Sequence, residues 1–305
     1  MYAFIVNPHS RTGLGLKVWR KLEAILKERK IEYRICMTHY PQHATEFARE
    51  LTETYKDLTL VALGGDGSIN EVVNGIRDLS NVTFAYIPIG SGNDFARSMQ
   101  LGSDPVKILE QILNPTSLAY IDVGRTTYGG TARHFAVSSG IGFDAEVCFQ
   151  NTSQGIKKWL NKLKLGKLSY TITALCHIYS LRPCTATLTL DTGEPQTFER
   201  VFFAAAMNQR FEGGGFRFCP KAEPTDGVLD IIIISDMPKL KALLLLPTAF
   251  FGLHVHFKGV HTFTCKRAII RSEAPLAIHT DGEPLSRETS VIFELEPEKL
   301  KFINK

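Results

Sequence analysis

The chain has 305 residues, with 35 Lys and Arg against 31 Asp and Glu, and a formal net charge of +4. Hydrophobic residues make up 44% and charged residues 22%; these are ordinary values for a folded protein and exclude an intrinsically disordered chain. A surplus of +4 spread over the whole sequence excludes a dedicated nucleic-acid binder. A chain of this length can bury roughly three-quarters of its unfolded surface, enough for one large domain or two medium ones.

The first third of the sequence alternates between two apolar patterns. Short apolar runs predict buried strands, and apolar residues spaced three or four apart predict helices. In chain order these are strand 2–6, helix 16–30, strand 31–37, helix 43–54, strand 58–63, helix 69–77, strand 83–87 and a helix near 93–99. Strands that alternate with helices predict a parallel sheet with helices on its faces. We therefore expect an α/β domain over residues 1–122.

The pattern changes after Asp122, where strands follow one another with few helices. The expected strands are 133–138, 185–190, 200–207, 228–234, 262–271 and 290–295, and the expected helices are 156–179 and 238–251. Consecutive strands predict an antiparallel β-sandwich, here over residues 123–295. We expect the tail, residues 296–305, to pack back on the first domain.

The most informative motif is Gly-Gly-Asp-Gly-Ser-Ile-Asn at residues 64–70, between a predicted buried strand and a predicted helix. Glycine lets a ligand approach the backbone closely, and the amides that open a helix favour an anion. Asp66 would repel a bare phosphate but suits a phosphate that carries Mg²⁺. The motif therefore predicts a nucleotide-phosphate site, whereas the alternative, an ordinary glycine-rich turn, would need only a Gly-Gly pair. No P-loop signature occurs, and the Rossmann fingerprint fits only loosely.

Polar residues also follow the other predicted strands of the first domain. Asn7 follows the first strand, Thr38 the second, and Gly-Ser-Gly-Asn-Asp at residues 90–94 the fourth. Ligands of open parallel sheets bind outside the carboxyl ends of the strands, so these positions predict a nucleotide cleft. For Asn7 or Thr38 alone, capping of a loop is an equally good explanation.

Two strings stand out in the second domain. Three glycines at residues 213–215 precede the string 220–230, and His-Thr-Asp-Gly-Glu-Pro occupies residues 279–284. Both strings contain an Asp-Gly pair, which is a hairpin-turn signal. Glu283 comes directly after the second pair, where a carboxylate could project and accept a proton from a substrate hydroxyl.

Four strings, in this order, resemble the diacylglycerol kinase catalytic-domain family, which includes sphingosine kinases and soluble bacterial lipid kinases. They are residues 64–72, 88–95, 213–229 and 281–284. The resemblance implies a phosphofructokinase- and NAD-kinase-like α/β domain, a β-sandwich domain and a cleft between them. It implies an ATP-dependent lipid kinase in which Asp66 helps hold the phosphates and catalytic Mg²⁺, and Glu283 is the general base. The residues implied to contact ATP are Asn7, Thr38, Gly64, Gly65, Asp66, Gly67, Ser68, Ile69, Asn70 and Ser91.

The resemblance also implies a structural Mg²⁺, held by the Asp226 carboxylate and the backbone carbonyls of Glu223 and Val228. Asp122 matches a position that supports this metal network. One departure lies in the first loop, where the family usually has glycine and this chain has Arg11. Arg11 loses a flexible position but could reach a phosphate.

A lipid substrate would bring the protein to a membrane surface. Residues 156–167 interleave apolar residues with five lysines, a pattern typical of a basic amphipathic helix on an anionic bilayer and equally of a solvated helix with its apolar stripe in the core. Residues 240–251 could line an acyl-chain pocket, although buried core explains them better. Residues 242–253 are too short for a membrane span, which takes about 20 residues, and the N-terminus does not read as a signal peptide.

The sequence therefore predicts a cytoplasmic, peripherally membrane-associated enzyme, in a compartment that keeps thiols reduced. Its six cysteines form no C-x-x-C pair, which argues against a zinc site. Its partner would be a lipid with a free hydroxyl, and no nucleic acid is expected. A kinase of a soluble polyol or nucleotide, and a regulator that binds nucleotide or lipid without turnover, stay open as alternatives. The lipid's identity and the oligomeric state, including a homodimer, are left open too.

Overall fold

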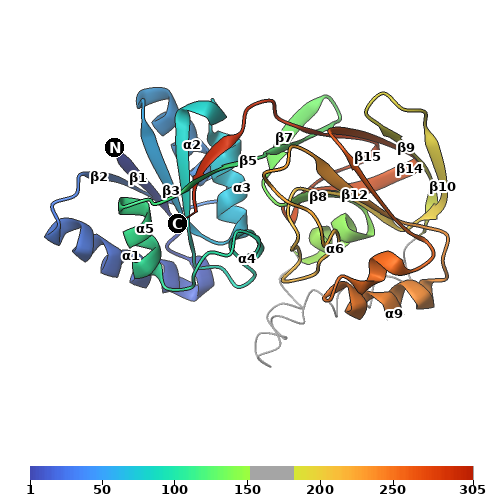
Figure 1. The fold of residues 1–305 in the computed structure, drawn as a ribbon, viewed down its shortest axis with the longest axis horizontal. Helices are drawn as coiled ribbons and strands as arrows, with labels where there is room; N and C mark the ends of the chain where they lie inside the picture. The colour runs from blue at the N-terminus through green and yellow to red at the C-terminus, as the bar shows by residue number, and fades with distance from the viewer. Residues whose placement is uncertain (152–181, 305) are drawn as a thin grey trace. The chain divides into compact units, whose positions relative to one another are not determined.

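The computed structural model describes residues 1–151 and 182–304. The chain forms two compact units, Met1–Val123 with Glu296–Lys305, and Gly124–Leu295 (Figure 1). The helix expected at residues 156–179, with its lysine-rich stretch, lies outside the described residues. Among the described helices, none combines the length and the apolar character needed to cross a bilayer.

The first unit is built on a six-stranded sheet in the order β2-β1-β3-β4-β16-β5. Its strands are β1 (Tyr2–Val6), β2 (Tyr33–Met37), β3 (Leu58–Gly64), β4 (Val82–Pro88), β5 (Leu118–Ile121) and β16 (Leu300–Ile303). β1 to β4 pair in parallel, and β16 from the end of the chain pairs in parallel with β4 and antiparallel with β5. The predicted parallel α/β sheet is thus confirmed.

Helices cover both faces of this sheet. They are α1 (Ser10–Glu28), α2 (His43–Thr54), α3 (Asp66–Gly75), α4 (Asp94–Ser98) and α5 (Pro105–Leu113), with a 3-10 turn η1 (Leu79–Asn81). Apolar residues of α1 and α5 share one core with alternate residues of β1, β3 and β4, and α2 and α3 lie together on the other face (Figure 1). α1 starts earlier than predicted, but Arg11, Thr12 and Gly13 have positive φ and form a turn ahead of the regular helix. Arg11 therefore occupies, at φ 46°, a conformation that favours glycine.

The second unit contains a ten-stranded sheet in which every pairing is antiparallel. Its strands are β6 (Gly124–Tyr128), β7 (Thr131–Phe135), β8 (Ser138–Gly142), β9 (Cys184–Leu190), β10 (Gln196–Val201), β11 (Phe203–Met207), β12 (Leu229–Ile234), β13 (Val260–Cys265), β14 (Arg267–Thr280) and β15 (Glu283–Leu295). The long strand β14 pairs with β9 along its first half and with β8 along its second. The predicted antiparallel second domain is confirmed.

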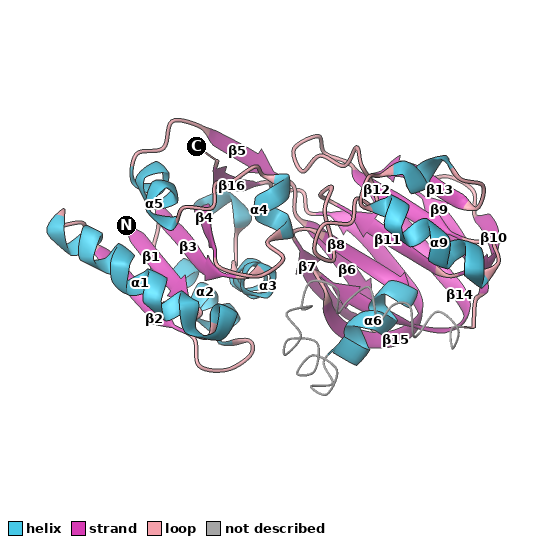
Figure 2. Ribbon diagram, turned by 90° about the horizontal axis from the view of Figure 1, so that it is seen from below, coloured by secondary structure: helices cyan, strands magenta, loops and turns pink. Residues whose placement is uncertain are grey.

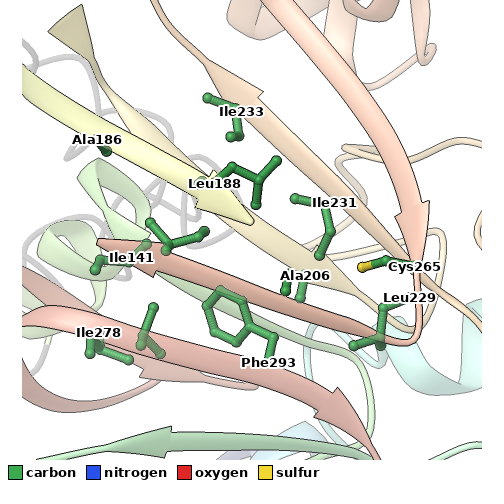
Figure 3. Packing of buried hydrophobic residues seen from close by; sticks show 14 of the residues in the cluster. Ile141, Ala186, Leu188, Ala206, Leu229, Ile231, Ile233, Cys265, Ile278 and Phe293 are labelled. Carbon is green, nitrogen blue, oxygen red and sulfur yellow. The ribbon is translucent and has the colours of Figure 1, made fainter. Parts of the chain in front are cut away.

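Alternate residues of the central strands serve two separate cores. Ala204 and Ala206 of β11 with Ile231 and Ile233 of β12 face a core shared with β9, β14 and β15, and Figure 3 shows Ala206 and Ile231 pointing into the same space as Phe293. The intervening residues of β11 and β12 face α6 (Phe143–Asn151) and α9 (Lys239–Ala249), which lie on the same side of the sheet (Figure 2). This period of two is what a sheet buried on both faces requires.

Two predicted strands are interrupted by side chains from distant residues. The strand expected at 133–138 breaks between β7 and β8, where the amides of Ala136 and Val137 donate to the Asp281 carboxylate. The strand expected at 262–271 breaks at Lys266, whose amide donates to Asp191. In both places a carboxylate takes hydrogen bonds that a neighbouring strand would otherwise accept.

Candidate functional site

The glycine-rich loop connects β3 to α3 and packs tightly against the loop after β4. The Gly64 carbonyl accepts hydrogen bonds from the amides of Ile89 (2.7 Å) and Gly90 (3.1 Å). A β-carbon on Gly90 would lie 2.7 Å from the Gly65 α-carbon, so the two backbones touch and Gly90 has no room for a side chain. The loop geometry thus requires the glycine that the sequence supplies there, and it presents the start of α3, where partial positive charge favours an anion.

Asp66 joins the two loops. Its carboxylate accepts hydrogen bonds from the amides of Asp94 (3.2 Å) and Phe95 (3.3 Å), and it therefore caps α4. Burial, followed by the charges of Asp66 and Asp94, raises the pKa of the neighbouring Tyr86 well above its ordinary value. The Tyr86 hydroxyl lies 3.1 Å from the Gly64 carbonyl oxygen. The predicted phosphate and Mg²⁺ role of Asp66 stays a prediction, and the structure adds to it a role in holding the loops together.

The other predicted nucleotide residues follow β1, β2 and β4 at the same edge of the sheet. The backbone amide of Asn7 donates to the Leu63 carbonyl (2.9 Å), and the backbone amide of the buried Thr38 donates to the Val6 carbonyl (2.9 Å). Asn70 is buried on α3, and Ser91 is exposed directly after Gly90. The structure brings the carboxyl ends of neighbouring strands together, as the topology of a parallel sheet requires.

The residues predicted to hold a structural Mg²⁺ fall into two groups. Asp122, in the first unit, is buried, and the Lys299 ammonium lies 2.9 Å from its carboxylate. Glu223, Asp226 and Val228 share one turn of the second unit, in which the Asp226 carboxylate accepts the Val228 amide (3.1 Å). The Asp226 amide donates to the Glu223 carbonyl (3.4 Å).

Charges of both signs lie at this turn: the Arg210 guanidinium donates to the Ala222 carbonyl (3.0 Å) and pairs with the Glu223 carboxylate. Burial, followed by the charge of Asp226, raises the pKa of Asp230 to about 6, although Lys221 opposes the shift. A carboxylate and backbone carbonyls are the hard oxygen donors that Mg²⁺ prefers. The donor set at Glu223, Asp226 and Val228 therefore fits the predicted ion.

Glu283 follows a two-residue hairpin turn between β14 and β15. Asp281 and Gly282 both have positive φ, 48° and 81°, as the tight turns of β-hairpins require. The Asp281 carboxylate accepts hydrogen bonds from three successive amides, those of residues 136, 137 and 138, at 2.8 to 3.0 Å. These three hydrogen bonds hold the turn in place, while Glu283 is exposed.

A buried cluster of titratable side chains lies next to this turn, and no sequence pattern predicted it. It consists of Asp144 at the start of α6, Glu212, and His279 near the end of β14. The Nε2 atom of His279 lies 2.7 Å from Asp144 Oδ2 and 3.6 Å from Glu212 Oε1. The ring passes over Gly140, where a β-carbon would lie 2.6 Å from Nε2. Nothing local in the sequence signals this contact, because Asp144 and His279 are 135 residues apart.

Two contacts favour opposite protonation states of His279. Burial alone would lower its pKa, but the Asp144 carboxylate, with Glu212 and Asp281, raises the pKa of His279 to about 9. The Gly282 amide, however, donates to Nδ1 (3.2 Å), which requires that Nδ1 carry no proton. A metal ion on Nε2 would put a proton on Nδ1, so this hydrogen bond favours a histidine–carboxylate pair over a metal site.

An apolar pocket opens beside the same cluster. Asp144 and His254 contribute its polar groups. Its apolar lining includes Phe143, Phe202, Phe203, Phe218, Leu243 and Leu246. The Asp144 carboxylate in the wall hydrogen-bonds to His279, which in turn accepts the amide of Gly282. One chain of contacts therefore links the pocket to the turn that precedes Glu283.

Comparisons with known proteins agree across the chain. The sequence model of the diacylglycerol kinase catalytic domain matches residues 1–126, and that of the YegS C-terminal NAD kinase beta sandwich-like domain matches residues 138–304. YtlR of Bacillus subtilis, which carries a provisional lipid kinase name, is 31% identical over 286 residues and 92% of each chain. A diacylglycerol kinase of Mycobacterium tuberculosis is 29% identical over 293 residues, 94% of this chain and 91% of that one.

Solved structures show the same fold. A diacylglycerol kinase structure from Bacillus anthracis superposes with a TM-score of 0.70 at 20% identity, covering 99% of this chain and 96% of that one. An NAD kinase of Archaeoglobus fulgidus superposes with a TM-score of 0.55 at 11% identity, covering 99% and 93%. At these identities the likeness concerns the fold alone.

Proposed function

The chain belongs to the diacylglycerol kinase catalytic-domain family, and on that premise we propose that it is an ATP-dependent lipid kinase. It would transfer the γ-phosphoryl group of ATP to the free hydroxyl of a diacylglycerol-like lipid, with the help of Mg²⁺ and with Glu283 as general base. The observation that carries the proposal is the apolar pocket and its hydrogen-bonded link, through Asp144 and His279, to the Glu283 turn. A pocket lined by aromatic and aliphatic side chains suits acyl chains and has no use in a kinase of soluble polyols.

The chemistry needs positioning and neutralisation of charge more than covalent catalysis. The loop at Gly64–Asn70 and the start of α3 would hold the ATP phosphates through backbone amides. Asp66 would be among the residues that hold Mg²⁺, which would neutralise charge on the phosphates. As the lipid oxygen bonds to the γ-phosphorus, the bond from phosphorus to the ADP oxygen breaks. The Glu283 carboxylate accepts the hydroxyl proton.

The decisive experiment measures ADP release with a panel of acceptors. Release that requires an added lipid, together with labelled phosphate in the lipid fraction, would support the proposal. The panel contains diacylglycerol, phosphatidylglycerol, a sphingoid base and a polyprenol, with glycerol and nucleosides as soluble acceptors. Turnover of a soluble acceptor alone would replace the lipid kinase by a polyol or nucleotide kinase, and binding without turnover would identify a regulator.

Filling the pocket should discriminate against long acyl chains. Ala242 lines the pocket on α9, and Ala242→Trp would occupy space that an acyl chain needs. We expect kcat/KM for a long-chain lipid to fall by about tenfold or more, because several buried methylenes at ~0.8 kcal/mol each lose their contacts. The KM for ATP should not change. Ala274→Trp, at an exposed position of the same unit, is the matched control, and an equal loss in both variants would exclude the pocket as the acyl site.

A further inference from the structure

Large apolar side chains gather on one exposed segment of the second unit. Ten such side chains are exposed in the described residues, and six of them belong to α9, to the 3-10 turn η3 (Leu253–His256) or to the residues next to these elements. These six, which we name the α9–η3 face, are Leu240, Leu244, Phe250, Phe251, Leu253 and Phe257. A cluster of this kind marks an interaction surface, whereas single exposed apolar residues do not.

The buried side of α9 holds the α9–η3 face in place. At about 100° per residue, Leu240 and Leu244 lie on the side of α9 opposite to Leu245 and Ala249, which are buried in the core. α9 is thus apolar on both sides, and its outer side reaches 67% exposure at Leu244, against 73% at Phe251 just beyond its end.

Contacts with the segment before residue 220 anchor the end of this structure. The Phe250 ring stacks on Phe216, with 4.0 Å between centroids. The buried His254 hydrogen-bonds to the Phe218 carbonyl (3.0 Å) through Nε2. The Arg217 amide donates to the Ala249 carbonyl (2.9 Å). The exposed apolar side chains therefore project from a well-packed base, and no local unfolding is needed to present them.

Most charges around the face are basic; the acidic exception is Asp236, which pairs with Arg200 and lies within electrostatic range of Lys258. No Asp or Glu occurs from residue 237 to residue 272. Lys239 and Lys241 lie at the start of α9, and the exposed Lys258 follows η3. The Lys241 ammonium donates to the Lys258 carbonyl (2.8 Å), so the basic residues at the two ends of the face lie next to each other. An apolar surface edged by lysines complements an anionic bilayer, where hydrocarbon lies beneath negative headgroups.

We propose that the α9–η3 face docks on the surface of an anionic phospholipid bilayer. The 11 residues of α9 are too few to span a membrane, so the helix would lie in the interface with its outer side chains among the acyl chains. The inner side of the same helix, at Ala242, Leu243 and Leu246, lines the apolar pocket. Docking would thus bring the pocket to the bilayer that contains the substrate; this link to catalysis rests on the proposed lipid kinase function.

Flotation with lipid vesicles tests docking without turnover. The full chain is mixed, in the absence of ATP, with vesicles of phosphatidylcholine or of phosphatidylcholine with phosphatidylglycerol. We expect binding to the anionic vesicles, and a fall of at least about tenfold in the partition coefficient for the double variant Leu244→Gln with Phe251→Gln. Lys258→Gln should weaken anionic binding about fivefold, since one interfacial lysine contributes about 1 kcal/mol.

A matched control separates this face from exposed apolar surface in general. Leu118 and Tyr120 are 45% and 55% exposed in the first unit, and Leu118→Gln with Tyr120→Gln should bind vesicles as the wild type does. An equal loss in this control, unchanged binding of the Leu244 and Phe251 variant, or equal binding of the wild type to neutral and anionic vesicles would each overturn the proposal. So would a dimer in vesicle-free buffer that the Leu244 and Phe251 variant abolishes, because the face would then bind a second copy.

A last comparison keeps this proposal distinct from the proposed function. The Leu244 and Phe251 variant should lose phosphorylation of lipid in vesicles but keep the wild-type kcat on a water-dispersed short-chain diacylglycerol. Absence of turnover in the wild type on both substrates would refute the lipid kinase while leaving the flotation result intact. Loss of the short-chain activity in this variant would overturn the docking role, since the face would then act in catalysis itself.

Discussion

Glu283→Gln should lower kcat by roughly 10²- to 10⁴-fold, the range that a general base contributes, while ATP still binds. The amide keeps the size of the side chain but cannot accept the proton of a lipid hydroxyl at neutral pH. The turn itself should persist, because the Asp281 carboxylate is held by the amides of residues 136–138 and none of these contacts involves Glu283. Lipid-dependent ADP release measures kcat, and calorimetric titration measures ATP affinity.

Glu273→Gln is the matched control for this substitution. Glu273 is exposed on β14 of the same unit and lies outside the proposed site, so its variant should turn over at the wild-type rate. A wild-type kcat in Glu283→Gln would remove Glu283 from the mechanism. Loss of ATP binding together with kcat would instead assign Glu283 to the nucleotide site.

The features that the sequence predicts well are those decided by neighbouring residues. The two-residue turn at Asp281-Gly282 follows from the Asp-Gly pair, since these residues adopt positive φ at low cost. The Gly-Gly pair at residues 64 and 65 by itself predicts a tight turn, and its backbone contact with Gly90 is seen only in the fold. Some local signals were missed: α5 begins at Asp104-Pro105, where the Asp104 side chain caps the Val106 amide, a standard start signal for a helix.

Other features depend on residues far apart in the chain, which no local pattern reveals. Asp66 looks like a phosphate-site carboxylate in the sequence, and only the fold shows that it also caps α4. The pairing of Asp144 with His279 requires Gly140 in the neighbouring strand, because a side chain there would collide with the ring. The register of β8 on β14 decides this contact. Register between strands that lie far apart in the chain is hard to predict from a single sequence.

His279 should make the stability of the protein depend on pH in a defined window. The pKa of His279 is raised in the folded chain from 6.5 to about 9 by the Asp144, Glu212 and Asp281 carboxylates, which overcome the effect of burial. The folded state then binds the proton more tightly than the unfolded state, so the stabilisation is complete below pH 6.5 and is lost as the pH rises through about 9. We expect the loss to be of the order of 3 kcal/mol in the free energy of unfolding.

Urea unfolding at several pH values, compared between the wild type and His279→Asn, measures this difference. The comparison is clean above pH 6.5, because burial lowers the pKa of His254 and this histidine stays neutral there. The wild type should lose its advantage over the variant between pH 6.5 and about 9. Stability that does not change over this interval would contradict the prediction and mean that the ring is already neutral.

A stability loss near pH 9 and a stability that does not change with pH have different consequences for the turn before Glu283. The Gly282 amide can donate to Nδ1 only when His279 is neutral, so protonation stabilises the fold and removes one restraint on the residue before Glu283. A stability loss near pH 9 would therefore coincide with formation of this hydrogen bond. Nitrogen chemical shifts of the His279 ring, measured over the same pH range, would detect an unprotonated Nδ1 directly. They would show whether the His279 ring at neutral pH is protonated beside Asp144 or is neutral and accepts the Gly282 amide.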